Sequence, residues 1–298
     1  PECNKLKAAL SRYLHVDPEL ISVGNGAIEI IYWFARAFAK NRVVIPAPTF
    51  CEYELSSHKA GAEVMLVACQ DFELDADEII EKAKGADALY LCNPNNPTGI
   101  LATRQIRKII ESVDSKTKIL LDECFIELVD EPDANTMIRD IEQFENLVIL
   151  RSLTKSFGLA GLRVGYGVCN PALTIKLSAD KIPWSVNGLA QEAGVVALAD
   201  RRHLSRARVI IKKERKFLYE NISELKLFSP SRSDANYFLV HLRNRSSTKF
   251  RNELLNKTGV LVRDCSTFSG MGSQHVRVAV KTHKENLQLL KALEGFDG

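Results

Sequence analysis

Residues 152–168, SLTKSFGLAGLRVGYGV, directly follow a short apolar run, LVIL, at residues 147–150. A run of this kind is typical of a strand that is buried on both faces of a sheet. A lysine just after such a strand lies at its carboxyl end, where open α/β sheets bind their ligands. Lys155 is therefore either part of a ligand site or, as for any lysine taken alone, an ordinary surface residue.

The residues around Lys155 favour the ligand site. Ser152 and Thr154 supply hydroxyl groups and Arg163 a positive charge, a grouping suited to an anionic phosphate. A nearby arginine also disfavours the ammonium form of a lysine, which makes its amine a better nucleophile toward a carbonyl.

The first two thirds of the chain alternate between strand and helix patterns. Helical spacing occurs at residues 30–38 and 106–110, between apolar runs at residues 43–45, 64–67, 88–92, 119–121 and 147–150. This alternation predicts a layered α/β domain with a mostly parallel sheet. A long charged helical stretch at residues 189–222 then leads to strand-like runs at residues 236–242 and 276–280. We expect a large domain over residues 20–198, and a smaller α+β domain built from residues 1–19 and 199–298.

The composition of the 298 residues excludes several classes of protein. The net charge of +3 and the 46% hydrophobic content are ordinary for a globular enzyme and give no reason to expect a nucleic-acid partner. No apolar run approaches the roughly 20 residues of a membrane-spanning helix, and no metal-ligand spacing connects the six histidines. Because of the histidine spacing we predict no metal site. Seven scattered cysteines are typical of free thiols, so we predict a cytoplasmic protein. The chain starts at Pro1 inside a helical pattern, and we expect an N-terminal arm to precede it.

Three more segments have a recognisable physical use. In VGNGAIE, residues 23–29, the backbone N–H groups of Gly26, Ala27 and Ile28 can face a phosphate at a helix start, although a plain strand-to-helix turn fits equally well. In LDECF, residues 121–125, Asp122 ends an apolar strand and is either a buried carboxylate that needs a cationic partner or a helix N-cap. NPNNPTG, residues 93–99, is a ligand loop or merely a proline-fixed turn.

Together, and in this order, these motifs resemble those of fold-type I pyridoxal 5′-phosphate (PLP) enzymes of the class I/II aminotransferase superfamily. The resemblance implies a three-layer fold-type I PLP-transferase in which Lys155 holds the cofactor as a Schiff base and Asp122 pairs with its pyridine nitrogen. It assigns the phosphate to Gly26, Ala27, Ile28, Ser152 and Arg163. It also implies that Asn96 bonds the phenolic oxygen and faces the substrate, that Phe50 in APTFCEY stacks on the ring, and that Arg277 in HVRVAV binds the substrate carboxylate. Active sites of this family usually lie between two subunits, which implies a homodimer.

Within the superfamily the chain is similar to threonine-phosphate decarboxylases and, next, to histidinol-phosphate aminotransferases. Phe125 stands where the aminotransferases of this branch usually carry a tyrosine. Segments 1–14, 45–54, 182–191 and 262–282 look more like the decarboxylases. The resemblance therefore implies decarboxylation of L-threonine O-3-phosphate to 1-aminopropan-2-yl phosphate in cobalamin biosynthesis. The alternatives are a histidinol-phosphate or related aminotransferase that uses 2-oxoglutarate and, more remotely, a silent binding module; the substrate is in the first two cases a phosphorylated amino acid or amino alcohol.

Overall fold

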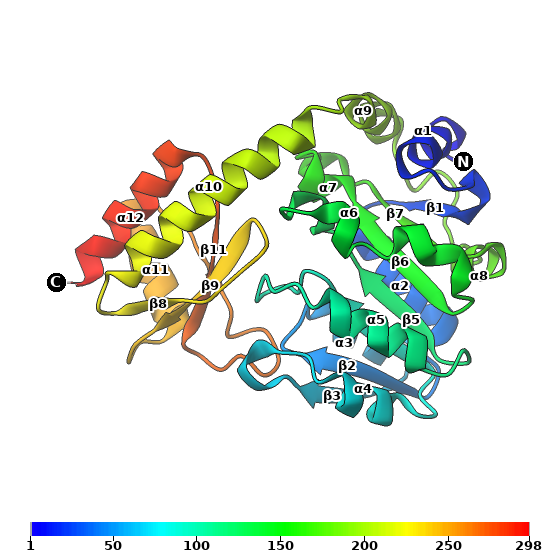
Figure 1. Cartoon of the computed structure of the whole chain (residues 1–298), viewed down its shortest axis with the longest axis horizontal. Coiled ribbons are helices and arrows are strands. Elements are labelled where there is room, and N and C mark those ends of the chain that lie inside the picture. The colour runs from blue at the N-terminus through cyan, green and yellow to red at the C-terminus, as the bar shows by residue number, and fades with distance from the viewer. Residues whose placement is uncertain (1, 298) are drawn as a thin grey trace.

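The computed structural model describes residues 2–297, which form two separate sheets (Figure 1). The larger sheet has seven strands in the order β1-β7-β6-β5-β4-β2-β3. Its strands are β1 (Ile21–Gly24), β2 (Arg42–Ala47), β3 (Glu63–Ala68), β4 (Ala88–Cys92), β5 (Lys118–Asp122), β6 (Leu147–Ser152) and β7 (Gly165–Val168). Strands β3, β2, β4, β5 and β6 pair in parallel, whereas β7 is antiparallel to both of its neighbours. The predicted mostly parallel α/β sheet is confirmed.

Helices cover both faces of this sheet because successive strand residues point to opposite sides. On β5, Leu120 packs into the cluster that contains α2 (Ala27–Phe38), α3 (Glu52–Lys59) and α8 (Pro171–Leu177). Its neighbours Ile119 and Leu121 pack on the opposite face. That face is covered by α1 (Asn4–Leu14), α4 (Ala76–Ala83), α5 (Thr103–Ser112) and α9 (Gly188–Ala199). The result is the expected three-layer arrangement.

The smaller sheet belongs to the C-terminal part of the chain. It contains β8 (Phe228–Pro230), β9 (Tyr237–Leu242), β10 (Arg263–Asp264) and β11 (His275–Ala279), all antiparallel, in the order β10-β11-β9-β8. A separate apolar cluster joins this sheet to α10 (His203–Ser223), α11 (Ser247–Thr258) and α12 (His283–Asp297). The small α+β domain predicted from the sequence is present, and α10 bridges the two parts (Figure 1).

The bridging region differs from the prediction in one respect. The helical pattern over residues 189–222 predicts one long stretch, but the structure contains two helices, α9 and α10. Asp200 leaves the helical conformation, and its Oδ1 atom accepts hydrogen bonds from the backbone N–H groups of Arg202 and His203. When an aspartate side chain accepts hydrogen bonds from backbone N–H groups two and three residues later in the sequence, it favours a turn over a continued helix.

The packing of α1 also differs from the expected domain limits, which place residues 1–19 in the small domain. Leu6 and Leu10 of α1 belong to the cluster of the large sheet, together with Leu153 and Ala190. A side chain on Gly194 of α9 would lie 2.9 Å from Leu6, so α1 and α9 are in close contact there. Pro1 lies outside the described residues. We therefore propose that α1 be counted with the large domain, because its apolar face is buried there.

None of the helices in this described part of the chain is long and apolar enough to span a membrane.

Candidate active site

Four of the predicted site residues, Asn96, Asp122, Ser152 and Lys155, lie at or just after the carboxyl ends of three adjacent parallel strands. Cys92 at the end of β4 pairs with Asp122 of β5, and Asp122 pairs with Leu150 of β6. Loop 93–99 follows β4, and Lys155 follows β6 in the short helix α7 (Leu153–Ser156). Parallel strands end on the same edge of a sheet, so the fold brings these segments together where α/β proteins bind ligands.

Asp122 is a buried carboxylate, with 7% of its surface exposed. It accepts hydrogen bonds from the Tyr53 hydroxyl at 2.6 Å and from the Cys124 backbone N–H at 2.8 Å. Burial raises the pKa of Asp122, although the hydrogen bonds from Cys124 and Tyr53 and the charge of Lys155 oppose this effect. It forms no ion pair within residues 2–297. Asp122 is not the N-cap of the helix that follows, because that helix begins at Ile126 with Phe125 as its N-cap. Asp122 is a buried hydrogen-bond acceptor that is suited to a cation.

Lys155 lies beside aromatic and charged side chains of the same edge. Its Nζ atom is 5.5 Å from the centre of the Phe125 ring. Although the side chain remains accessible, the surrounding protein excludes much of its water, and this desolvation lowers the pKa of Lys155. The positive charges of Arg277 and Arg163 lower it further, against the opposing influence of Cys124 and Asp122. A lysine in this setting has a larger neutral fraction than a free one and is a better nucleophile.

The glycine turn after β1 lies next to Arg163. Gly26 is the N-cap of α2 and has φ of 81°, a conformation that favours glycine. A Cβ atom on Gly26 would lie 2.7 Å from Nη2 of Arg163, and one on Gly165 would overlap the backbone nitrogen of Ala27. The first N–H groups of α2, including those of Ala27 and Ile28, have no partner within their helix. This helix start with an arginine against it is a suitable place for a phosphate.

Ser152 begins the helix that carries Lys155, and Phe50 packs against the tyrosine that bonds Asp122. Ser152 is buried, and its Oγ atom accepts a hydrogen bond from the Thr154 backbone N–H at 3.2 Å, which begins α7. Phe50 packs edge-on against Tyr53, with ring centres 5.6 Å apart. Since Tyr53 bonds Asp122, Phe50 is one residue removed from the buried carboxylate, and its stacking role stays a prediction.

Arg277 brings the small sheet to the same site. Its Nη1 atom donates to Oδ1 of Asn96, and its guanidinium lies 4.8 Å from the centre of the Tyr237 ring. The Tyr237 hydroxyl donates to the backbone carbonyl of Asn95 at 3.0 Å, and its ring contacts Phe125 edge-on at 4.8 Å. Burial lowers the pKa of Arg277. Asn96 and Arg277, which are 181 positions apart in the sequence, therefore form one polar group.

Residues 2–293 match the family Aminotransferase class I and II, which covers nearly the whole chain. The chain belongs to this family. Class I and II aminotransferases are PLP-dependent enzymes, so the cofactor expected from the sequence is confirmed.

Relatives within the class I and II aminotransferases carry two kinds of name. A protein of Caldanaerobacter subterraneus, provisionally named a threonine-phosphate decarboxylase, is 33% identical over 98% of this chain and 81% of its own length. The histidinol-phosphate aminotransferase of Methanocaldococcus jannaschii is 35% identical over 97% of this chain and 78% of its own. The crystal structure of histidinol-phosphate aminotransferase from Clostridium acetobutylicum superposes with a TM-score of 0.93 at 30% identity, and covers 99% of this chain and 89% of that one.

The groups at the strand ends fit the cofactor of the class I and II aminotransferases. Asp122 is a buried carboxylate without a cationic side chain paired to it in residues 2–297, which suits a protonated ring nitrogen. Lys155 has a lowered pKa, which suits an amine that reacts with an aldehyde. The turn at Gly26 with Arg163 offers N–H groups and positive charge for a phosphate.

Sequence reasoning missed two tyrosines that complete the site. Tyr53 is fully buried and bonds Asp122, and Tyr237 lies between Phe125 and Arg277. Tyr53 stands in the same segment as Phe50, which is a weak signal. Tyr237 stands in a strand-like run where an aromatic residue is ordinary core, so only the packing of the two domains identifies it.

Proposed function

We propose that this protein decarboxylates L-threonine O-3-phosphate to 1-aminopropan-2-yl phosphate and carbon dioxide, as a step of cobalamin biosynthesis. The observation that supports this choice is Phe125, whose ring lies beside Lys155 and Tyr237. The aminotransferases that the chain resembles usually place a tyrosine hydroxyl at this position, and a phenyl ring offers no such donor. The similarity to the relative from Caldanaerobacter points the same way.

In this proposal the large domain holds PLP and the small domain directs the substrate. Lys155 carries the cofactor, Asp122 pairs with its ring nitrogen, and Asn96 and Phe50 hold the ring. The phosphate is held by Gly26, Ala27 and Ile28 of the turn, with Ser152 and Arg163. When bound, PLP withdraws electrons from the Cα atom of an amino substrate.

Arg277 is proposed to hold the substrate carboxylate through a bidentate pair. Its contacts with Asn96 and with the Tyr237 ring fix the direction of the guanidinium. The orientation of the carboxylate, and therefore the Cα bond that breaks, is then set by the position of the small sheet. In decarboxylation the bond to the carboxylate carbon breaks, carbon dioxide leaves, and a proton is added at Cα.

The second candidate is a histidinol-phosphate aminotransferase, in which the lowered pKa of Lys155 would serve proton transfer as well as cofactor binding. An amine that is partly neutral can take a proton from Cα and give it back elsewhere, which transamination requires. The Methanocaldococcus relative also supports this candidate.

One pair of assays separates these candidates. Purified protein with PLP is incubated with L-threonine O-3-phosphate and assayed for carbon dioxide, and separately with histidinol phosphate and 2-oxoglutarate and assayed for glutamate. Carbon dioxide release without a keto acid supports the decarboxylase, with the Lys155→Ala variant as the inactive control. Glutamate formation in the second reaction, with no carbon dioxide in the first, would show that the protein is the aminotransferase and not the decarboxylase. If neither product forms with PLP present, a binding module becomes the better explanation.

We also propose a homodimer, because large apolar side chains are exposed around α8 and α9. Ile182, Trp184 and Leu189 are 68%, 74% and 77% exposed. Single exposed apolar residues are common, but three within eight positions form a surface that a second copy can cover. Sedimentation of the protein and of its Trp184→Ser/Leu189→Ser variant tests this: the variant should sediment as a monomer. A parent protein that is itself monomeric would contradict it.

A further inference from the structure

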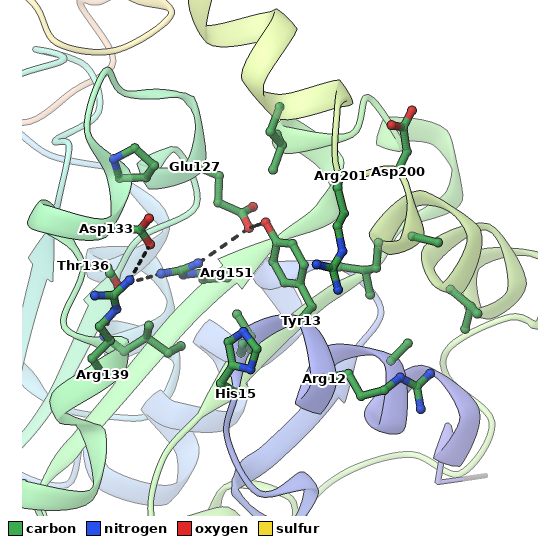
Figure 2. A pocket seen from close by; sticks show the side chains of 18 of the residues that line it. Arg12, Tyr13, His15, Glu127, Asp133, Thr136, Arg139, Arg151, Asp200 and Arg201 are labelled. Atoms are coloured by element: carbon green, nitrogen blue, oxygen red, sulfur yellow. Dashed lines mark hydrogen bonds and ion pairs between the residues drawn. The ribbon is translucent and has the colours of Figure 1, made fainter.

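A large pocket lies outside the group of residues around Lys155. Figure 2 shows the side chains that line it. It is a cleft open to solvent, with a volume of about 640 Å³, and is lined by the end of α1, the segment 127–139 and the junction of α9 with α10. Pockets of roughly 300 to 1,000 Å³ accommodate small organic ligands. None of Gly26, Asp122, Lys155, Arg163 or Arg277 lines it.

The pocket and the catalytic group are separated by a hydrogen-bonded wall. Glu127 lines the pocket and accepts a hydrogen bond from the Tyr13 hydroxyl at 2.7 Å. Its other carboxylate oxygen accepts one from Ser156, the residue after Lys155. Arg151 lies 3.6 Å from Glu127 and also bonds Glu123. A ligand in the pocket would therefore contact Tyr13 and Glu127 without reaching Lys155.

The lining is dominated by positive charge. Five arginines (Arg12, Arg139, Arg151, Arg201 and Arg208) face three carboxylates (Glu127, Asp133 and Asp200), and His15 adds a titratable ring. This leaves two positive charges in excess. A cleft whose lining carries an excess of one sign of charge attracts ligands of the opposite sign.

Not all of these arginines are committed to protein partners. Arg151 is tied to Glu123 and Glu127, and Arg139 pairs with Asp133 at 3.1 Å. The carboxylate of Asp200 accepts from the backbone at the start of α10. Arg12 and Arg201, by contrast, have no side-chain hydrogen bond or ion pair to residues 2–297. Figure 2 shows the side chains of Arg201 and His15 on either side of Tyr13.

We propose that this pocket is a second ligand site, which binds the phosphate group of a small phosphorylated compound or inorganic phosphate. Free guanidinium groups present planar sets of N–H donors that match phosphate oxygens. The Tyr13 ring and the side chains of Val195 and Leu198 provide an apolar surface for the remainder of an ester. The site is distinct from the one that holds the phosphate of the cofactor.

The test is a binding measurement on the PLP-loaded protein by isothermal titration calorimetry. The probes are inorganic phosphate and glycerol 3-phosphate. The double variant Arg12→Gln/Arg201→Gln removes the two uncommitted guanidinium groups, and both positions are exposed, so the fold should persist. The matched control is Arg202→Gln/Arg206→Gln, which removes the same charge from exposed positions of the same region that do not line the pocket.

We expect the pocket variant to bind the better probe at least about tenfold more weakly, as the loss of charge-assisted hydrogen bonds predicts, and the control to stay within about twofold. Tighter binding of glycerol 3-phosphate would identify an ester as the ligand, and tighter binding of inorganic phosphate would identify the free anion. Equal binding by parent and pocket variant would overturn the proposal. So would loss of binding in Arg277→Gln with retention in the pocket variant, because the anion would then belong to the catalytic group.

Discussion

Asp122 and Glu123 are consecutive carboxylates at the end of β5, and both are buried, with 7% and 1% of their surfaces exposed. Glu123 accepts two hydrogen bonds from Arg151, at 3.1 and 2.8 Å, and others from Thr136 and the Met137 backbone. Asp122 accepts from Tyr53 and from the Cys124 backbone and has no arginine or lysine bonded to it in the described residues. Both groups are carboxylates, both are buried and they are adjacent in the sequence, but they have different hydrogen-bond partners.

This difference separates a structural carboxylate from a ligand-binding one. A buried charge costs free energy unless it is paired, and Glu123 has its cation in the protein itself. Asp122 retains a raised pKa because of its burial. The hydrogen bonds from Tyr53 and Cys124 and the charge of Lys155 offset part of the cost of burying Asp122, and a cation bound beside it would offset more. That is the role we propose for the protonated ring of PLP.

The largest effect should come from Asp122→Asn, which we expect to lower kcat at least about a thousandfold, equivalent to about 4 kcal/mol. The amide has the same shape but no charge, so it cannot keep the ring nitrogen protonated. Steady-state assays at saturating PLP measure this loss. The control is Asp87→Asn. The Asp87 carboxylate accepts hydrogen bonds from the backbone N–H groups of Asn41 and Arg42, and it is not one of the site residues. A nearly active Asp122→Asn enzyme would remove Asp122 from the site.

Arg151→Met should act on stability instead, lowering the free energy of unfolding by about 3 kcal/mol. The substitution leaves Glu123 buried without its cation. Urea denaturation measures the change, and the double variant Glu123→Gln/Arg151→Met should recover part of it, as expected for coupled residues. Arg107→Met is the control: Arg107 bonds Asp140 at 2.7 Å, but 42% of its side-chain surface is open to solvent, so its loss should cost less than about 1 kcal/mol.

The pH dependence of stability should differ in sign between Asp122 and Asp87 in the cofactor-free protein. Because the folded state raises the pKa of Asp122, this group stabilises the fold most below its unfolded pKa, near 3.8, and loses that contribution as the pH rises through the folded value. Asp122→Asn should therefore match the parent near pH 4 and exceed it in stability at pH 8. Urea denaturation at both pH values gives the comparison.

Asp87 provides the opposite case. Burial opposes ionisation there, but hydrogen bonds from the Arg42 and Asn41 backbone outweigh it and lower the pKa of Asp87. Its contribution is present above the unfolded pKa and is lost as the pH falls, so Asp87→Asn should be less stable than the parent at pH 8. If both variants shifted in the same direction, the contrast between a fully buried carboxylate, whose pKa burial raises, and a half-buried one, whose pKa backbone hydrogen bonds lower, would fail.

The sequence was sufficient for the fold and for the order of the site segments, because both depend on local patterns. The run KILLD predicts a buried strand with Asp122 at its end, and the structure has both. The partners of the two carboxylates could not be predicted this way. Tyr53 reaches Asp122 across 69 positions, and Arg151 reaches Glu123 across 28, through packing that no periodicity encodes. The association of α1 with the large sheet was missed for the same reason: an apolar helix face indicates burial but not its location.

The smallest effect should come from Tyr53→Phe, which deletes the hydroxyl that donates to Asp122 at 2.6 Å and keeps the ring. The carboxylate retains the Cys124 backbone donor, so we expect a loss of about 1 kcal/mol, seen as roughly five- to tenfold weaker PLP binding in a fluorescence titration. Tyr90→Phe is the matched control, because Tyr90 stacks on Tyr53 with ring centres 5.2 Å apart but bonds Ser57 and not Asp122. Equal losses in the two variants would assign the effect to ring packing. The partners of Asp122 would then no longer explain why it, and not Glu123, is the carboxylate that binds the cofactor.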